Sequence, residues 1–346
     1  MKQNNLTNKS LKIIWAVQPF SGDKAVLQSA AWCLRALVKS ETAEIEPVYV
    51  WPATPLDNPN SREPSTLDII QKEGEKELKA ILNRIKIPGI QPLRILAKNA
   101  LTVRQEAKEL MDYALEQNAE LLVVSSHGRK GIKRLFLGSF AETITLYSSI
   151  PLLIVHPGWR KSSDFKTILF TTDFSMESME AFSRVMDMAE KRKGRIILFH
   201  KVGSDLYPPF DFAFSTQVYY QQAIEDELAA NEKIVKTLVE QGKKRGVRVN
   251  VVIDKKSNGS VSEAILKQAK RLGCRMIGLF SRSGPASSLL MGSSTRQVVR
   301  SSELPVWVIH PTLKQETKRE SERPFFSVTE EDLKSDLIEH GESRST

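Results

Sequence analysis

The sequence predicts an α/β protein made of two tandem domains, each an open, mostly parallel five-stranded sheet with flanking helices. Short apolar runs of strand length alternate with helical patterns along most of the chain. The alternation then starts again halfway, because Ile13 and Ile168 are 155 residues apart and Pro151 and Pro305 are 154 apart. A period this long indicates tandem domains and excludes a solenoid of short repeats.

The first repeat is expected to contain five strands. They are short apolar runs at residues 11–17, 45–51, 93–96, 121–124 and 151–155. Helices are expected where apolar residues recur at three- and four-residue spacing, at residues 21–40, 66–85, 102–117 and 140–146. Four prolines predict an irregular loop over residues 52–64.

The second repeat follows the same order. Its strands are expected at residues 168–173, 196–200, 247–253, 276–280 and 305–309. Its helices are expected at residues 175–191, 221–242 and 261–271, with a last one ending near residue 301. A partly aromatic insert, residues 207–220, precedes the second helix. These elements predict domains over residues 1–158 and 159–311. Residues 312–346 are expected to form a charged, partly disordered tail, with one short helix starting near Thr329.

Composition favours a soluble cytoplasmic protein. The apolar fraction is 41% and the charged fraction is 26%, which is ordinary for globular domains. No apolar run approaches the roughly 18 residues of a membrane span. The polar N-terminus carries no apolar signal-peptide region. The two cysteines, Cys33 and Cys274, are far apart in the sequence, which disfavours a disulfide framework or a cysteine metal site.

The positive charge is unevenly distributed. The chain carries a formal charge of +9, and the tail contributes six basic and nine acidic residues, so the rest of the chain carries +12. A basic surface can bind nucleic acid, acidic lipid or a phosphorylated ligand, although it more commonly keeps a protein soluble. We expect no nucleic-acid binding, since the basic residues are scattered along the sequence without an interleaved aromatic platform.

A glycine-containing basic loop follows the strand at residues 121–124 and precedes the helix at residues 140–146. Nine residues separate Gly128 from Gly138, and Ser139 follows. Glycines let the backbone approach a phosphate, and free N–H groups at a helix N-terminus donate to an anion. Arg129 and Lys130 supply positive charge inside the loop. This stretch predicts a phosphate-binding site.

These residues resemble the universal stress protein family. In that family strand 4 is followed by the pattern Gly-x2-Gly-x9-Gly-Ser/Thr, which holds the ribose and phosphates of ATP in the members that bind it. Gly128, Gly138 and Ser139 match the second half of the pattern, and Ser125 occupies the position of its first glycine. The resemblance covers residues 11–158 and 165–311. It implies a Rossmann-like fold of the adenine nucleotide alpha hydrolase type, with ATP as the ligand.

The resemblance also implies how the two domains meet. In the family the last strand is an edge that pairs antiparallel with its counterpart in a partner domain. The apolar runs at residues 151–155 and 305–309 would supply both edges within one chain. We therefore expect an intrachain pseudo-dimer, with further homo-oligomerisation left open.

The two repeats depart from the family pattern in different ways. Gln18 stands where the family has an aspartate, although its amide can still hydrogen-bond a base or a ribose. The second repeat keeps Asp173 and the Gly292-Ser293 pair, which the resemblance implies as nucleotide contacts. It has Arg282 at the position equivalent to Gly128, and a residue with a Cβ is costly where φ must be positive. We therefore expect ATP in the first repeat rather than the second.

The sequence contains no catalytic constellation and no metal-ligand spacing. His127 lies alone in the basic loop, and general acid–base chemistry also needs positioned partners. The expected function is therefore a non-catalytic or very weakly hydrolytic, nucleotide-binding module in the stress response. The alternative hypothesis is a ligand-free interaction protein of the same fold, which uses the insert at residues 207–220 and the tail to hold a protein partner.

Overall fold

The computed structural model describes residues 10–18, 24–52, 66–100, 102–126, 139–157, 159, 164–202, 214–255, 259–281 and 292–310. Residues 10–157 are called half one below, and residues 164–310 half two. The strands of half one are β1 (Leu11–Ala16), β2 (Ala43–Pro52), β3 (Arg94–Ala100), β4 (Leu121–Ser125) and β5 (Leu152–Val155). Its helices are α1 (Lys24–Leu37), α2 (Thr66–Arg84), α3 (Val103–Glu116) and α4 (Ser139–Tyr147), with a short 3-10 helix, η1 (Val38–Ser40), after α1.

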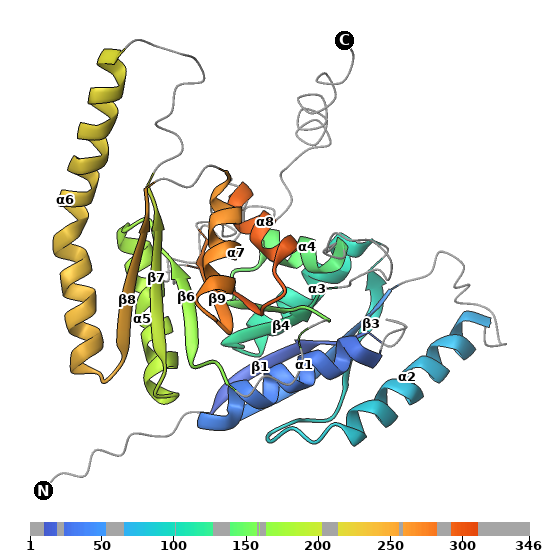
Figure 1. Cartoon of the computed structure of the whole chain (residues 1–346). Coiled ribbons are helices and arrows are strands. Elements are labelled where there is room, and N and C mark those ends of the chain that lie inside the picture. The colour runs from blue at the N-terminus through green and yellow to red at the C-terminus, as the bar shows by residue number, and fades with distance from the viewer. Residues whose placement is uncertain are drawn as a thin grey trace, which may run out of the picture.

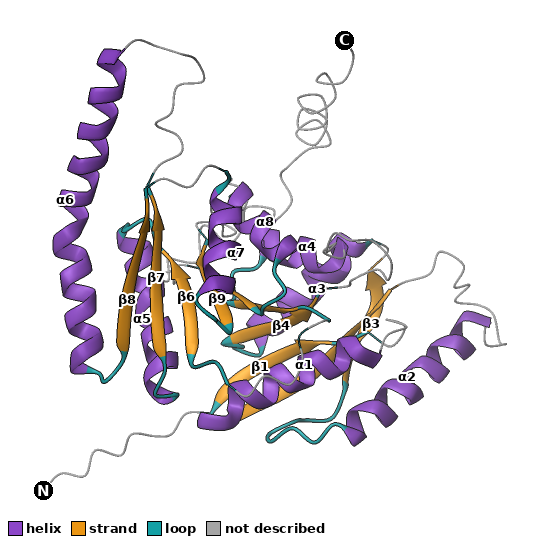
Figure 2. Ribbon diagram, viewed as in Figure 1, coloured by secondary structure: helices purple, strands orange, loops and turns teal. Residues whose placement is uncertain are grey.

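Half two repeats this order of elements. Its strands are β6 (Thr167–Thr171), β7 (Arg195–Lys201), β8 (Arg248–Asp254), β9 (Met276–Phe280) and β10 (Val306–Ile309). Its helices are α5 (Met176–Lys191), α6 (Phe214–Lys244), α7 (Val261–Arg271) and α8 (Ser293–Ser301). The predicted fold class is confirmed, and the two sheets join into one sheet of ten strands in the order β3-β2-β1-β4-β5-β10-β9-β6-β7-β8 (Figures 1 and 2).

The join between the halves has local two-fold symmetry. β5 and β10 are the antiparallel pair in an otherwise parallel sheet. Leu153 pairs with Trp307, its own equivalent in the repeat, and Ile154 pairs with Val306. The pseudo-two-fold axis therefore passes between Leu153 and Trp307. The predicted intrachain pairing of the two edge strands is confirmed.

Two apolar layers cover the sheet, and each layer runs through both halves. On one face lie α1, α2, α5 and α6, with Trp15, Phe182 and Trp307 in one cluster. On the other face lie α3, α4, α7 and α8, with Leu122 and Val308 in a second cluster. Strands buried on both faces must be apolar at every position, which explains the continuous apolar runs in the sequence. The halves therefore share their core and are not merely tethered.

Several element boundaries differ from the sequence prediction. Helix α6 begins at Phe214, so residues 214–220, predicted as part of an insert, belong to the helix. Glutamine, alanine and glutamate from residue 221 onward favour helix, and no proline between Phe214 and Lys244 interrupts it. Strand β3 continues to Ala100 because it pairs with β2 past an irregularity at Pro52. The tail and residues 127–138 lie outside the described residues, and the domain boundaries at 158 and 311 stay predictions.

Candidate functional site

Each half contains a topological switch point at the carboxyl ends of its strands. In half one β1 lies between β2 and β4, and the chain leaves β1 toward one side and returns to β4 on the other. The helices that follow β1 and β4, α1 and α4, therefore pack on opposite faces of the sheet. In open α/β sheets a crevice forms at this point and commonly binds ligands. In half two the corresponding strands are β6 and β9.

Half one has a hollow at its switch point. It has an empty volume of about 310 Å³, part of which is open to solvent. Its lining comes from the ends of β1 and β4 and from the first turns of α1 and α4, and consists of Ala16, Gln18, Val26, Leu27, Val124, Ser125 and Phe140. Because the hollow opens to solvent, its residues mark a surface that a ligand could contact at the switch point.

Ser125 supplies a buried polar atom to this hollow. Its residue is only 7% exposed, and its hydroxyl oxygen has no hydrogen-bond partner among the described residues. Leaving such a group unsatisfied costs about 1–3 kcal/mol, so buried hydroxyls nearly always find a partner. A ligand with a hydroxyl or amine group would provide that partner. The half-buried side chain of Gln18 lies on the same hollow.

The structure brings together part of the predicted site. Gln18 and Ser125 line the hollow, and Ser139 is the first residue of α4, directly before Phe140. Gly128, Arg129, Lys130 and Gly138 lie outside the described residues. The apolar lining was not predicted from the sequence as part of a site. Val26 and Leu27 fit the ordinary core pattern of a helix, and only the crossover at the switch point shows that they reach the hollow.

The backbone of half two aligns Asp173 with Gln18. The amide of Val17 donates to Val48 O at 2.9 Å, and the amide of Thr172 donates to Phe199 O at 3.0 Å. These equivalent bonds confirm the spacing of 155 residues at the end of the first strand of each half. Asp173 is therefore the positional equivalent of Gln18, as the sequence predicted.

Asp173 already has local hydrogen bonds. Its Oδ1 accepts from the backbone N–H of Ser175 at 3.0 Å and from the hydroxyl of Ser175 at 2.6 Å. Ser175 in turn caps α5. Phe174, the residue after Asp173, has a φ of 59° and packs against His200 with ring centroids 4.9 Å apart. The end of β6 in half two is thus stabilised by the contacts of Asp173 with Ser175 and of Phe174 with His200.

Half two has no serine at the end of β9, the strand that corresponds to β4 and its Ser125. Ser126 N donates to Val155 O at 2.9 Å, and Ser281 N donates to Ile309 O at 3.0 Å. These bonds make Phe280 the equivalent of Ser125. A phenyl ring thus stands where half one has a small hydroxyl side chain.

The two repeats differ by one residue between β9 and α8. Counted from β9, the equivalent of Gly128 is Ser283, whereas counted back from α8 it is Arg282. Neither residue is a glycine, and both lie outside the described residues. Gly292 caps α8 with an ordinary φ of −51°, and a Cβ there would meet no atom within 4 Å. Its backbone conformation does not require glycine.

The described part of the chain contains no group of three or more histidine, cysteine or acidic side chains arranged to hold a metal ion. None of its helices is long and apolar enough to span a bilayer.

Comparison with known proteins connects this geometry to a family. The sequence profile of the universal stress protein family matches residues 10–156 and again residues 164–310. A universal stress protein of Mycolicibacterium smegmatis is 26% identical over 223 residues, which are 62% of this chain and 70% of that protein. Universal stress protein MJ0531 of Methanocaldococcus jannaschii is 24% identical over 141 residues, which are 40% of this chain and 79% of that protein.

A solved structure shows the same fold. The universal stress protein of Archaeoglobus fulgidus superposes with a TM-score of 0.62 at 18% identity, covering 87% of this chain and 99% of that one. The two profile matches together span most of the chain, and their limits coincide with the two halves of the sheet. The chain therefore belongs to the universal stress protein family, whose domain it contains twice.

Proposed function

We propose that this chain is a cytoplasmic, nucleotide-responsive module of the stress response that binds one ATP in half one. The observation that carries the proposal is the hollow at the switch point between β1 and β4, where the buried Ser125 hydroxyl has no partner among the residues that the structure describes. The family pattern around Gly128, Gly138 and Ser139 supports the same position, since it follows β4 directly.

Each part of the site would hold one part of the nucleotide. The apolar lining from α1 and β4 would pack against the base, and the Gln18 amide would hydrogen-bond a base or ribose edge. Ser125 would exchange a hydrogen bond with a polar edge of the ligand. The free N–H groups at the start of α4, with Arg129 and Lys130 nearby in sequence, would bind the phosphates.

We propose that half two stabilises the fold and contains no equivalent ATP site. Phe280 replaces the small side chain of Ser125, and the Asp173 carboxylate already accepts two hydrogen bonds from Ser175. We also propose that bound ATP acts as a ligand rather than as a substrate. No general base in the described part of the chain is hydrogen-bonded to Ser125, and an unactivated hydroxyl is a weak nucleophile.

The first prediction tests this assignment with a matched pair of variants. Gln18→Ala is expected to weaken ATP binding about five- to tenfold, the value of about one hydrogen bond. Asp173→Ala, at the equivalent position of half two, is expected to leave ATP affinity unchanged. Both are measured by titration of the full chain with ATP, together with the nucleotide released on denaturing the purified protein. If neither ATP binding nor bound nucleotide is found, the ligand assignment is wrong and the fold stands.

A further inference from the structure

Three turns of half two contain an unusual number of basic residues. They connect α5 to β7, α6 to β8 and α7 to β9, and they read EKRKGR at residues 190–195, KKRGVR at 243–248 and KRLGCR at 270–275. Eleven of these 18 residues are basic and one is acidic. We call these three segments the basic edge.

The parallel topology places the three turns along one edge of the sheet. Strands β6, β7, β8 and β9 run in the same direction, so the turns that lead into them meet at their amino ends. Arg195 is in register with Arg248, and Arg275 N donates to the carbonyl of Thr167, the residue in register with Arg195. Figure 2 shows the α5–β7 and α6–β8 turns at the lower end of half two.

The arginines at the strand starts form a row on one face of the sheet. Residues in register on parallel strands point to the same face, and neighbouring strands lie about 4.8 Å apart. Arg195 also donates to the Leu272 carbonyl at 3.3 Å, which connects the row to the end of α7. The row of guanidinium groups is therefore held on rigid strand ends rather than on a loop.

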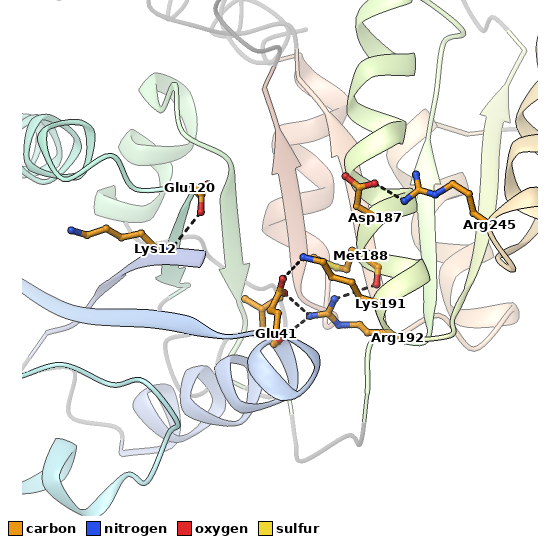
Figure 3. Close-up of polar contacts among 9 residues, drawn as sticks. Lys12, Glu41, Glu120, Asp187, Met188, Lys191, Arg192 and Arg245 are labelled. Atoms are coloured by element: carbon orange, nitrogen blue, oxygen red, sulfur yellow. Dashed lines mark hydrogen bonds and ion pairs between the residues drawn. The ribbon is translucent and has the colours of Figure 1, made fainter. Parts of the chain in front are cut away.

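Most of these charges have no carboxylate partner within the described ranges of the chain. Lys191 and Arg192 pair with Glu41 at 2.7 and 3.1 Å, and Arg245 pairs with Asp187 at 2.7 Å (Figure 3). The remaining eight basic residues are all exposed, and no described carboxylate forms an ion pair with any of them. A surface with so many unneutralised cations attracts polyanions.

The fold itself does not require this charge. The corresponding turns of half one, residues 38–43, 84–94 and 116–121, contain four basic and three acidic residues. The two halves share the same topology, so the excess belongs to the sequence of half two. Family membership therefore does not explain the basic edge.

The surface chemistry favours a nucleic-acid duplex as the partner. Among the described residues, the exposed large apolar side chains are Leu115 and Met176, and neither belongs to the basic edge. Peripheral membrane surfaces generally add apolar or aromatic residues that insert among lipids, and single-strand sites add aromatic residues that stack on bases. Guanidinium groups match phosphate geometry, and a duplex presents a dense row of phosphates.

We propose that the basic edge of half two binds the phosphodiester backbone of a nucleic-acid duplex without reading its sequence. This reverses the expectation from the primary sequence, in which the same residues are spread over more than 80 positions. The parallel topology collects them at one edge. The basic edge shares no residue with the hollow of half one, so the proposal is independent of ATP binding.

The test uses the full chain and fluorescently labelled DNA and RNA duplexes of about 20 base pairs and unrelated sequences. Fluorescence anisotropy is measured between about 50 and 200 mM salt, where backbone binding is strongly salt-dependent. The variant Arg248→Gln/Lys270→Gln/Arg275→Gln removes three exposed cations that form no ion pair with a described carboxylate. We expect at least about tenfold weaker binding at the lowest salt and a fall of about 2–3 in the slope of log affinity against log salt.

A matched control removes the same charge from half one. Lys39→Gln/Arg84→Gln/Lys86→Gln changes three exposed residues at the equivalent turns and is expected to leave binding within about twofold. Equal losses in the two triple variants would show that only net charge matters and would overturn the proposal. So would the absence of duplex binding at about 50 mM salt. Binding to phosphatidylserine vesicles through the same three residues, without duplex binding, would assign the edge to a membrane and refute the nucleic-acid partner.

Discussion

At the scale of single residues, replacing Ser125 is expected to weaken ATP binding without destabilising the free protein. Its hydroxyl is buried without a partner in the described structure, so Ser125→Ala removes an unsatisfied group from the free protein. We expect the free energy of unfolding without nucleotide to stay the same or rise by about 1 kcal/mol, while ATP affinity falls about tenfold. Urea denaturation and ATP titration of the same variant check both outcomes. A loss of stability without nucleotide would mean that the hydroxyl has a partner in the free protein.

Arg192 makes a different kind of contact, between the ends of two helices. Its guanidinium donates to the carbonyl of Met188 near the end of α5, to the carbonyl of Leu37 at the end of α1, and to Glu41 (Figure 3). Helix C-termini carry partial negative charge, so one buried cation stabilises both ends. Burial lowers the pKa of Arg192, and Glu41 opposes that shift.

Replacing this arginine is expected to be costly. Arg192→Met should lower the free energy of unfolding by about 3–5 kcal/mol, since Glu41 and two helix ends lose a buried partner. Lys191→Met is the matched control, because Lys191 pairs with the same Glu41 but its side chain is 51% exposed. It should change stability by less than about 1 kcal/mol. Equal effects in urea denaturation would contradict the role assigned to burial.

At the scale of elements, α3 and α7 begin with the same local device. Thr102 and Ser260 each cap a helix, and Gln105 and Glu263 complete the two capping boxes. Ser260→Ala is expected to lower the free energy of unfolding by about 1 kcal/mol. Thr237→Ala, in the middle of α6, should be neutral or stabilise by a few tenths of a kcal/mol, because that hydroxyl only bonds back to the carbonyl of Lys233. Thermal or urea unfolding that gives both variants the same sign would exclude this explanation.

Elements were predictable where local signals agree with the tertiary context. Apolar runs such as Leu121–Ser125 indicate buried strands, and the residue that starts a capping box indicates a helix start. The end of β3 was not predictable, because its last residues have little strand propensity and Ala100 is held by pairing with Pro52 of β2. The start of α6 was not predictable either, because the aromatic residues after Phe214 are typical of an insert although they belong to the helix.

At the scale of the whole molecule, the repeat spacing in the sequence matches the symmetry of the sheet. Equivalent residues 154 apart, Leu153 and Trp307, lie opposite each other on the pseudo-two-fold axis. The candidate site was only partly predictable. Gln18 and Ser125 follow from alignment to a motif, whereas the apolar hollow depends on how α1 crosses the switch point. The basic edge was not predictable from local patterns, because its turns meet only in the folded sheet.

The last prediction concerns how firmly the halves are held together. A protease site placed between Trp159 and Asp164 allows the folded chain to be cut between β5 and β6. We expect the cut protein to elute as one particle, because β5 pairs with β10, the apolar layers run through both halves and Arg192 bridges α5 to α1. Size-exclusion chromatography under native conditions measures this, with urea as the condition that separates the fragments. In the cut form of Arg192→Met the fragments should separate at a lower urea concentration than in the cut form of Lys191→Met. Separation of the unsubstituted fragments in native buffer would show that the shared core and the β5–β10 pairing are too weak to hold two domains without a covalent link.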